Sequence, residues 1–330
     1  MDAGHDVTVL TYRPGDFYSD ELSEARVPHV FIGDGKGDAK VVKGIAEYVD
    51  RTGTEVLISF LTGANLKACL AKSRNPRLRL IVSERNCNLN LMPHDMLRFR
   101  LFERCADAVV CNSFAQEEFI RKHCDWLSPR LYCIPNFVDF VKFFPNGSKV
   151  NAVKVIAVMA RVCSRKNTVG LILAASRVKS GFRIEWHGLT GNSLYASVCK
   201  GLIRLCHLEE VFALLPASHN PEEVYRDADF FCLPSFYEGT SNAIAEALSC
   251  GLPAICSDVS DNHRYVEEGR NGFLFNPHRT SSIAGAITRL LELSPEEMSV
   301  MKSQSLKVAA ESYGKERLVR DYEKVIGNWR

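Results

Sequence analysis

Short apolar runs rich in β-branched residues alternate with longer helical patterns along the whole chain, and this alternation constrains the fold more than any other feature. Such runs include DVTVLTY, VLISF, LRLIV and AVVCNS in the first half, and KVIAVMA, FRIEWHG, FFCLPS and PAICSD in the second. Near-continuous apolar strands separated by helices are typical of parallel sheets covered on both faces. The sequence therefore predicts an α/β protein.

A polar interruption, FFPNGSKVN, divides the pattern into two halves and reads as a linker. The length of 330 residues agrees with this division, because domains commonly have about 100–200 residues each. We predict two Rossmann-like domains facing a cleft, over residues 1–145 and 146–313. The final stretch, residues 314–330, is predicted as an amphipathic helix that packs back on the first domain.

The first residues, AGHDVTVLT, have the pattern of a helix end followed by a strand. In a doubly wound sheet, the first strand in chain order lies between the second and the fourth. We therefore expect a segment of about 30 residues, most of one βαβ unit, to be missing ahead of this stretch. The first domain would then lack its first strand and the loop after it.

Composition limits the kinds of partner that the protein can bind and the cellular compartment in which it is expected. The net charge is +2, so no global charge attracts nucleic acid. The twelve cysteines form no C-x-x-C pair and are expected to be reduced, as in the cytoplasm. No apolar run reaches the ~18–20 residues of a membrane span. These features predict a cytoplasmic protein that binds no nucleic acid.

Two loops of the second domain carry residues that indicate chemistry. Arg161 and Lys166 follow its first predicted strand, and Glu238 follows a later one. Parallel strands end at the same edge, where open α/β sheets bind ligands. The next predicted helix begins at Gly239, Thr240, Ser241 and Asn242. The free N–H groups at the start of a helix favour an anion.

Cations and a helix start that converge on one edge describe a diphosphate pocket. Glu246 lies too far into the helix to reach phosphates, but its carboxylate could accept two ribose hydroxyls. Glu238 lies outside the helix and could meet a sugar hydroxyl. The residues therefore point to a nucleotide-sugar with one carboxylate at each end. The alternatives are a solvated helix face for the glutamates and a basic turn without ligand for Arg161 and Lys166.

The stretch EGTSNAIAEALSCGLPAICSD, with its Glu-x7-Glu spacing, resembles the signature of the retaining family-4 glycosyltransferases, which have the GT-B fold. The segments ARVCSRKN, DAVVCNS, IPNFVD and EEGRNGFLFNP resemble further family motifs. IVSERN resembles a subgroup of bacterial polysaccharide and glycan enzymes, in which this segment replaces a histidine. On this resemblance, Arg85 is the candidate catalytic residue on the acceptor side.

The resemblance also implies roles for the other site residues. Arg161 and Lys166 would neutralise the donor diphosphate, and the amides of residues 239–242 would bind its distal phosphate. Glu238 would hold the transferred sugar, and Glu246 would hold the ribose. No metal or other cofactor is expected. The implied reaction moves a hexose or N-acetylhexosamine from a nucleotide-sugar, most simply UDP-linked, to a lipid-linked or surface glycan.

Several positions depart from the family pattern. Its Gly-Arg is Ala160-Arg161 here, its Lys-Gly is Lys166-Asn167, and Pro216 stands where a strand glycine is usual. A glycine-rich loop of the family falls in the segment expected to be missing. The alternative hypothesis is therefore a catalytically inactive nucleotide-sugar-binding or scaffold protein. An NAD-dependent oxidoreductase is disfavoured, because no acceptable glycine fingerprint follows a first strand.

A basic run between Lys67 and Arg104 also contains the apolar residues Leu97, Phe99, Leu101 and Phe102. One interpretation is a surface that approaches anionic lipid at the inner face of the membrane. The other is a helix that packs through its apolar face and keeps its arginines in water.

Overall fold

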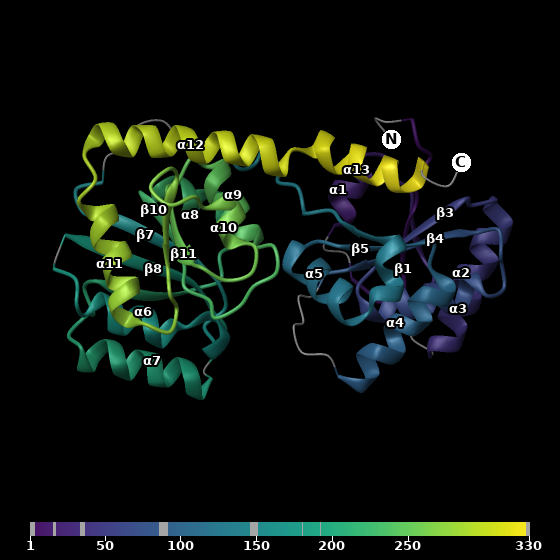
Figure 1. Ribbon diagram of the computed structural model, residues 1–330, viewed down its shortest axis with the longest axis horizontal. Coiled ribbons are helices and arrows are strands. Elements are labelled where there is room, and N and C mark those ends of the chain that lie inside the picture. Colours follow the sequence, from purple (N-terminus) through teal and green to yellow (C-terminus); the bar gives the residue numbers. More distant parts are fainter. Residues whose placement is uncertain are drawn as a thin grey trace. The chain divides into compact units, whose positions relative to one another are not determined.

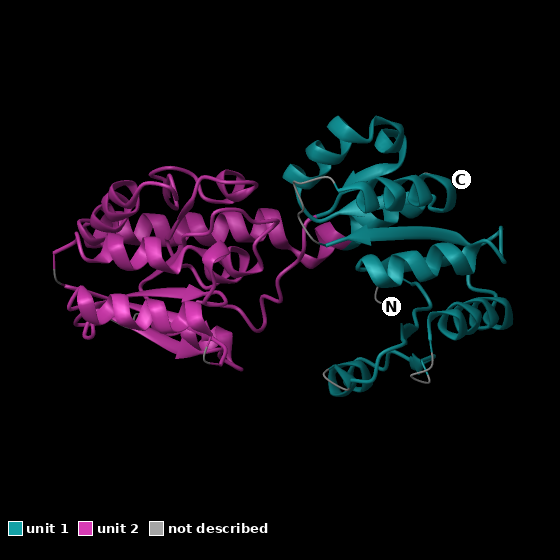
Figure 2. Ribbon diagram, turned by 90° about the horizontal axis from the view of Figure 1, so that it is seen from below, with its two compact units in different colours: residues 1–134, 319–330 teal, residues 135–318 magenta. Residues whose placement is uncertain are grey.

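The computed structural model describes residues 4–15, 18–33, 37–85, 92–145, 151–179, 181–191 and 193–327. The chain divides into two compact units, distinguished by colour in Figure 2. Unit 1 contains residues 1–134 and 319–330, and unit 2 contains residues 135–318. Both units have parallel strands covered by helices, which confirms the predicted α/β fold with two Rossmann-like domains.

Unit 1 contains two separate groups of parallel strands. The two-stranded group consists of β1 (Val9–Thr11) and β2 (His29–Phe31). The four-stranded sheet has the order of the chain: β3 (Val56–Phe60), β4 (Arg79–Glu84), β5 (Ala108–Cys111) and β6 (Leu131–Cys133). The helices are α1 (Ser19–Glu24), α2 (Asp38–Thr52), α3 (Thr62–Lys72), α4 (Pro93–Cys105), α5 (Phe114–His123) and the 3-10 helix η1 (Asp125–Arg130).

Apolar residues at alternate positions of β4 build the core of unit 1. Leu80 and Val82 are fully buried and pack in one cluster with Phe99 and Phe102 of α4. Ile81, which points to the opposite face, is also fully buried. A strand buried on both faces accounts for the continuous apolar run LRLIV.

The six strands of unit 2 form one parallel sheet in the order β12-β11-β10-β7-β8-β9. They are β7 (Lys154–Met159), β8 (Phe182–Leu189), β9 (Phe212–Pro216), β10 (Phe230–Leu233), β11 (Ala254–Ser257) and β12 (Gly272–Phe275). The first strand, β7, is central. The chain builds outward on one side through β8 and β9, then returns to build on the other side from β10. The strand order therefore reverses between β7 and β10, and ligands of such sheets bind at this switch point.

Helices flank this sheet (Figure 1). They are the 3-10 helix η2 (Ser164–Lys166), α6 (Thr168–Ala175), α7 (Leu194–Leu205), α8 (Pro221–Asp227), α9 (Asn242–Ser249), α10 (Asn262–Tyr265), α11 (Thr280–Leu291) and α12 (Pro295–Tyr313). After α12 the chain continues into α13 (Lys315–Gly327). The start of α12 is fixed by a capping box of Ser294 and Glu297, with Pro295 in its first turn.

The passage from unit 1 to unit 2 lies between Ile134 and Pro135, ahead of the predicted boundary at residue 145. Packing explains the difference. The Val138 N–H donates to the Tyr313 carbonyl at 3.0 Å, and Phe143 is buried in a cluster of unit 2. Residues 146–150 of the predicted linker lie outside the described residues. The final predicted helix corresponds to α13, whose residues from Val319 onward belong to unit 1.

Among the helices of the described residues, none is both long and apolar enough to cross a membrane.

Candidate functional site

The loops after β7 and β10 open at the same edge of the unit 2 sheet, on either side of the switch point. The first loop leads from β7 to α6, and the second leads from β10 to α9. They are bonded together, because the Phe236 N–H donates to the Arg165 carbonyl at 2.9 Å. The Arg165 guanidinium also lies over the Tyr237 ring, 5.5 Å from its centroid. The fold thus joins two predicted loops that are far apart in sequence.

Lys166 and Glu238 form an ion pair across these loops, in which Lys166 Nζ donates to Glu238 Oε1. Their side chains are only 14% and 11% exposed, respectively. Water screens such a pair weakly, so removing one partner leaves the other charge largely uncompensated. The residue predicted to bind the phosphate, Lys166, and the residue predicted to bind the sugar, Glu238, are therefore direct neighbours.

Polar contacts hold the segment between Glu238 and α9 at the N-terminal end of α9, where the helix dipole is positive. Ser241 is the N-cap of α9, and its side chain accepts from a backbone N–H of the first turn. The Thr240 hydroxyl donates to Asp261 Oδ2, and the Glu238 N–H donates to Ser260 Oγ, both at 3.4 Å. This geometry places the start of a helix dipole beside the Lys166–Glu238 pair, a combination that favours an anion.

Two departures from the family's glycines have local explanations. Asn167 adopts the left-handed conformation, with φ 57° and ψ 39°, which asparagine tolerates better than most residues. Its side chain donates to the Pro277 carbonyl at 2.9 Å. Beside position 160, the residue that must lack a side chain is Gly188, because a Cβ on Gly188 would lie 2.1 Å from the Ala160 carbonyl oxygen.

Glu246, in the second turn of α9, is held by a residue that sequence reasoning missed. The Tyr225 hydroxyl, on α8, donates to Glu246 Oε2 at 2.9 Å. Burial raises the pKa of Glu246 to about 7; the Tyr225 hydrogen bond and the charge of Lys142 act in the opposite direction, and the charge of Glu222 raises it further. The carboxylate at the predicted ribose position is thus anchored and half-buried.

Arg161 and Arg85 are placed differently from the Lys166–Glu238 pair. Arg161 is exposed on the loop after β7, and within the described chain no hydrogen bond or ion pair joins its side chain to residues 238–242. Arg85 follows β4 in unit 1. Its guanidinium donates to the Tyr322 hydroxyl at 3.1 Å and lies 4.9 Å from the centroid of the Phe60 ring. Arg85 is therefore held at the carboxyl edge of the unit 1 sheet.

Other neighbours of the site were also missed. Asn136 Nδ2 donates to Asn242 Oδ1 at 2.7 Å, which ties the IPNFVD motif to the start of α9. Lys142 pairs with Glu222 at 3.5 Å, beside Glu246. The sequence signal for Asn136 was present in that motif, but the segment was assigned to the other domain. No local pattern marks Tyr225, because its role depends on how α8 and α9 pack.

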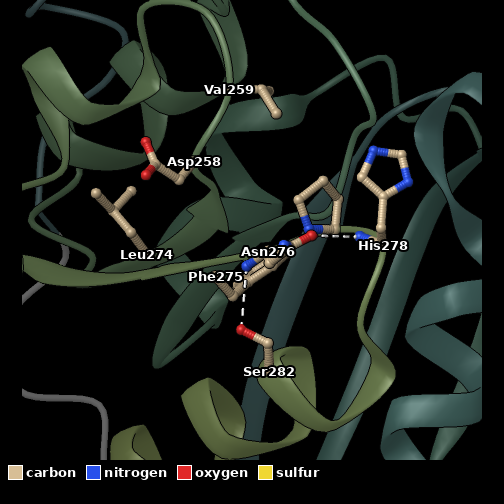
Figure 3. Close-up of a pocket in the computed structure, with 8 residues that line it drawn as sticks. Asp258, Val259, Leu274, Phe275, Asn276, His278 and Ser282 are labelled. Atoms are coloured by element: carbon tan, nitrogen blue, oxygen red, sulfur yellow. Dashed lines mark hydrogen bonds between the residues drawn. The ribbon is translucent and has the colours of Figure 1, made fainter.

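A hollow of about 340 Å³ borders the site at the ends of β11 and β12 (Figure 3). Asp258 and Val259 line it from the β11 side, and residues 274–278 line it from the β12 side. The His278 ring stacks on Phe236, with centroids 5.0 Å apart. The hollow thus adjoins the loop that carries Glu238.

Lys166, Glu238 and the start of α9 thus meet at the switch point of a Rossmann-like sheet, the place where α/β proteins of this kind bind ligands. Among the residues that the structure describes, no three or more His, Cys, Asp or Glu gather in a group that could hold a metal ion. The profile of the family described as "Glycosyl transferases group 1" matches residues 141–308, about half of the chain. That of "Glycosyltransferase Family 4" matches residues 1–142. The chain belongs to the family-4 glycosyltransferases of the GT-B fold.

Two curated relatives are similar over long stretches. The N-acetylgalactosamine-N,N'-diacetylbacillosaminyl-diphospho-undecaprenol 4-alpha-N-acetylgalactosaminyltransferase of Campylobacter jejuni is 23% identical over 285 residues, covering 83% of this chain and 76% of the relative. The UDP-Gal:alpha-D-GlcNAc-diphosphoundecaprenol alpha-1,3-galactosyltransferase of Escherichia coli is 27% identical over 207 residues, covering 57% of this chain and 52% of the relative.

Solved structures share the fold across nearly the whole chain. A glycosyltransferase from Rickettsia africae superimposes with a TM-score of 0.85 at 15% identity, covering 99% of this chain and 92% of the other. HepE of Anabaena, solved in complex with UDP and glucose, superimposes with a TM-score of 0.83 at 18% identity, covering 98% of this chain and 91% of the other.

Proposed function

We propose that this chain transfers a hexose or N-acetylhexosamine from a UDP-linked donor to a lipid-linked glycan, with retention of the anomeric configuration and without a bound metal ion. The observation that carries the proposal is the Lys166–Glu238 pair beside the start of α9 at the switch point. The names of both curated relatives contain a diphospho-undecaprenol acceptor, and HepE was solved with UDP and glucose. These names support the choice of acceptor and donor class.

In the proposed reaction, the bond between the anomeric carbon and the diphosphate oxygen breaks. The acceptor hydroxyl oxygen bonds to that carbon from the same face, and its proton goes to the departing diphosphate. Negative charge then grows on the diphosphate, where Lys166, Arg161 and the N–H groups of residues 239–242 oppose it. One such preorganised donor contributes about 3 kcal/mol to lowering a barrier. These groups take the part that a divalent ion plays in metal-dependent transfer.

The remaining residues position the reactants in this proposal. Glu238 exchanges its contact with Lys166 for a hydroxyl of the transferred sugar, while Lys166 turns to the diphosphate. Glu246 accepts the ribose hydroxyls through its carboxylate. Arg85 acts on the acceptor side from unit 1.

The function is tested by following UDP release. The chain is incubated with UDP-galactose, UDP-glucose or the UDP-N-acetylhexosamines and with undecaprenyl-diphosphate-linked glycans, with and without EDTA. We expect one donor–acceptor pair to release UDP at a rate that EDTA does not change. If EDTA abolishes turnover and a divalent ion restores it, the proposal that transfer needs no metal ion is wrong. Tight UDP binding without turnover for any pair would favour the inactive binding protein instead.

Peripheral contact with an anionic membrane is a further part of the proposal. Leu97 on α4 is 75% exposed and Arg104 is exposed. Other cations of this run are engaged in ion pairs: Lys67 with Asp38, Lys72 with Asp107, and Arg98 with Glu84 and Asp95. The exposed cations Arg74, Arg77 and Arg104 could attract lipid, at about 1 kcal/mol for each cation near the surface.

We therefore expect weak, salt-sensitive binding to vesicles that contain anionic lipid. In a pelleting assay, binding at low salt should disappear at high salt, and Leu97→Ser should reduce it. Val300→Ser is the matched control, because Val300 is an exposed aliphatic residue of α12 in unit 2. If the unchanged chain stays in the supernatant at low salt, this surface does not bind lipid.

A further inference from the structure

Tyr225 connects α8 to the carboxylate at the predicted ribose position. The side chain is fully buried. Its ring packs edge-on against Phe143 and Phe231, with centroids 6.0 Å and 5.8 Å away. Because these rings fix the direction of the hydroxyl, the hydrogen bond to Glu246 Oε2, at 2.9 Å, has one geometry.

We propose that Tyr225 is a positioning residue for donor binding, which holds Oε2 of Glu246 so that Oε1 faces the ribose hydroxyls of the nucleotide. The inference rests on the proposed function, in which Glu246 accepts those hydroxyls. A glutamate side chain has several rotatable bonds, and fixing it on binding costs side-chain entropy. An anchor on one carboxylate oxygen removes part of this cost in advance. Among the described residues, no hydrogen-bond donor is assigned to Oε1.

Other titratable groups lie around Glu246 on several elements. Glu222 lies on α8 with Tyr225, Lys142 comes from the segment before β7, and Cys250, a neutral thiol with a raised pKa, is the C-cap of α9. Lys142 pairs with Glu222, which limits its attraction for Glu246. Tyr225 is therefore the neutral donor that stabilises the ionised carboxylate in a half-buried place.

The same contact ties donor binding to pH. The pKa of Glu246 is about 7, raised mainly by burial and lowered by the Tyr225 hydrogen bond. Ribose hydroxyls donate to an ionised carboxylate better than to a protonated one. UDP affinity should therefore rise as the pH increases through 7 and level off above it. Without the tyrosine hydroxyl, the pKa of Glu246 rises further, and the increase in affinity moves to higher pH.

The test measures UDP binding to the full chain by calorimetry between mildly acidic and mildly alkaline pH, for the unchanged chain, Tyr225→Phe and Glu246→Gln. At neutral pH we expect Tyr225→Phe to weaken UDP by about fivefold, the value of one net hydrogen bond. The loss should shrink at alkaline pH, whereas a merely structural defect would persist there. Glu246→Gln should bind UDP much as the unchanged chain does at mildly acidic pH, where Glu246 is protonated, should weaken UDP at alkaline pH, and should remove the rise near pH 7.

Tyr132→Phe is the control, because Tyr132 is a half-buried tyrosine of β6 in unit 1. Its UDP binding should match that of the unchanged chain. Thermal unfolding of each variant separates folding from binding. If Tyr225→Phe keeps both the affinity and the pH midpoint while Glu246→Gln weakens UDP, the positioning role is wrong and the proposed function survives. If Glu246→Gln binds UDP normally at alkaline pH, the ribose role in the proposed function fails.

Discussion

Replacing Glu238 with glutamine is expected to slow sugar transfer by about 10²–10³-fold, as loss of one preorganised active-site contact does elsewhere. UDP itself should bind at least as tightly as to the unchanged chain. In the structure, Glu238 forms an ion pair with Lys166. The neutral glutamine of the variant cannot form this pair, so the lysine becomes available to the diphosphate. Steady-state transfer rates and the Kd for UDP, measured on the same preparation, check the two halves of the prediction.

The control for this experiment is Glu268→Gln. Glu268 also forms an ion pair, with Arg289, but the two side chains are 50% and 49% exposed and lie away from the switch point. Exposed pairs contribute little, typically about 0–1 kcal/mol, so this variant should transfer and bind normally. An equal loss of transfer and UDP binding in Glu238→Gln would mean that Glu238 contacts the nucleotide and not only the sugar.

Replacing Lys166 with alanine is expected to weaken UDP by about 10–100-fold, the value of one hydrogen bond to a charged group. Transfer should fall further, because the same cation opposes charge on the departing diphosphate. The variant also leaves Glu238, which is 11% exposed, without its partner. We therefore expect a lower thermal midpoint, since an uncompensated and largely buried charge destabilises the fold.

The double variant Lys166→Ala/Glu238→Gln separates these two effects. It should recover thermal stability, because no unpaired charge remains, but it should not recover UDP affinity. Lys200→Ala removes an exposed lysine of α7 and should change neither quantity. If Lys166→Ala binds UDP with normal affinity, Lys166 does not contact the diphosphate, whatever the effect of the variant on stability.

The fold and the two loops of the site could be predicted because their signals are local. Each apolar run marks a strand, and in a parallel sheet the residues after two strands meet at one edge. This reasoning brought Lys166 and Glu238 together without coordinates. The switch point itself was not visible in the sequence, since it depends on β10 pairing with β7 and not with β9.

Features that depend on packing could not be predicted. Tyr225 lies in a short helix with no motif, and only the contact between α8 and α9 brings it to Glu246. The start of the compact unit 2 at Pro135, ahead of the polar stretch, could not be predicted either, because the burial of Phe143 against unit 2 leaves no polar signal. The exposed position of Arg161 likewise could not be read from its place in the loop.

The position of Gly188 has a consequence for finding other chains of this kind. A pattern that demands glycine before the loop arginine rejects this sequence at Ala160, although the backbones approach closely here too. With φ 138° and the Ala160 carbonyl against its open side, residue 188 is the one that cannot carry a side chain. Searches should therefore require a glycine at the end of the second strand of the nucleotide unit and let the residue before the arginine vary among small side chains.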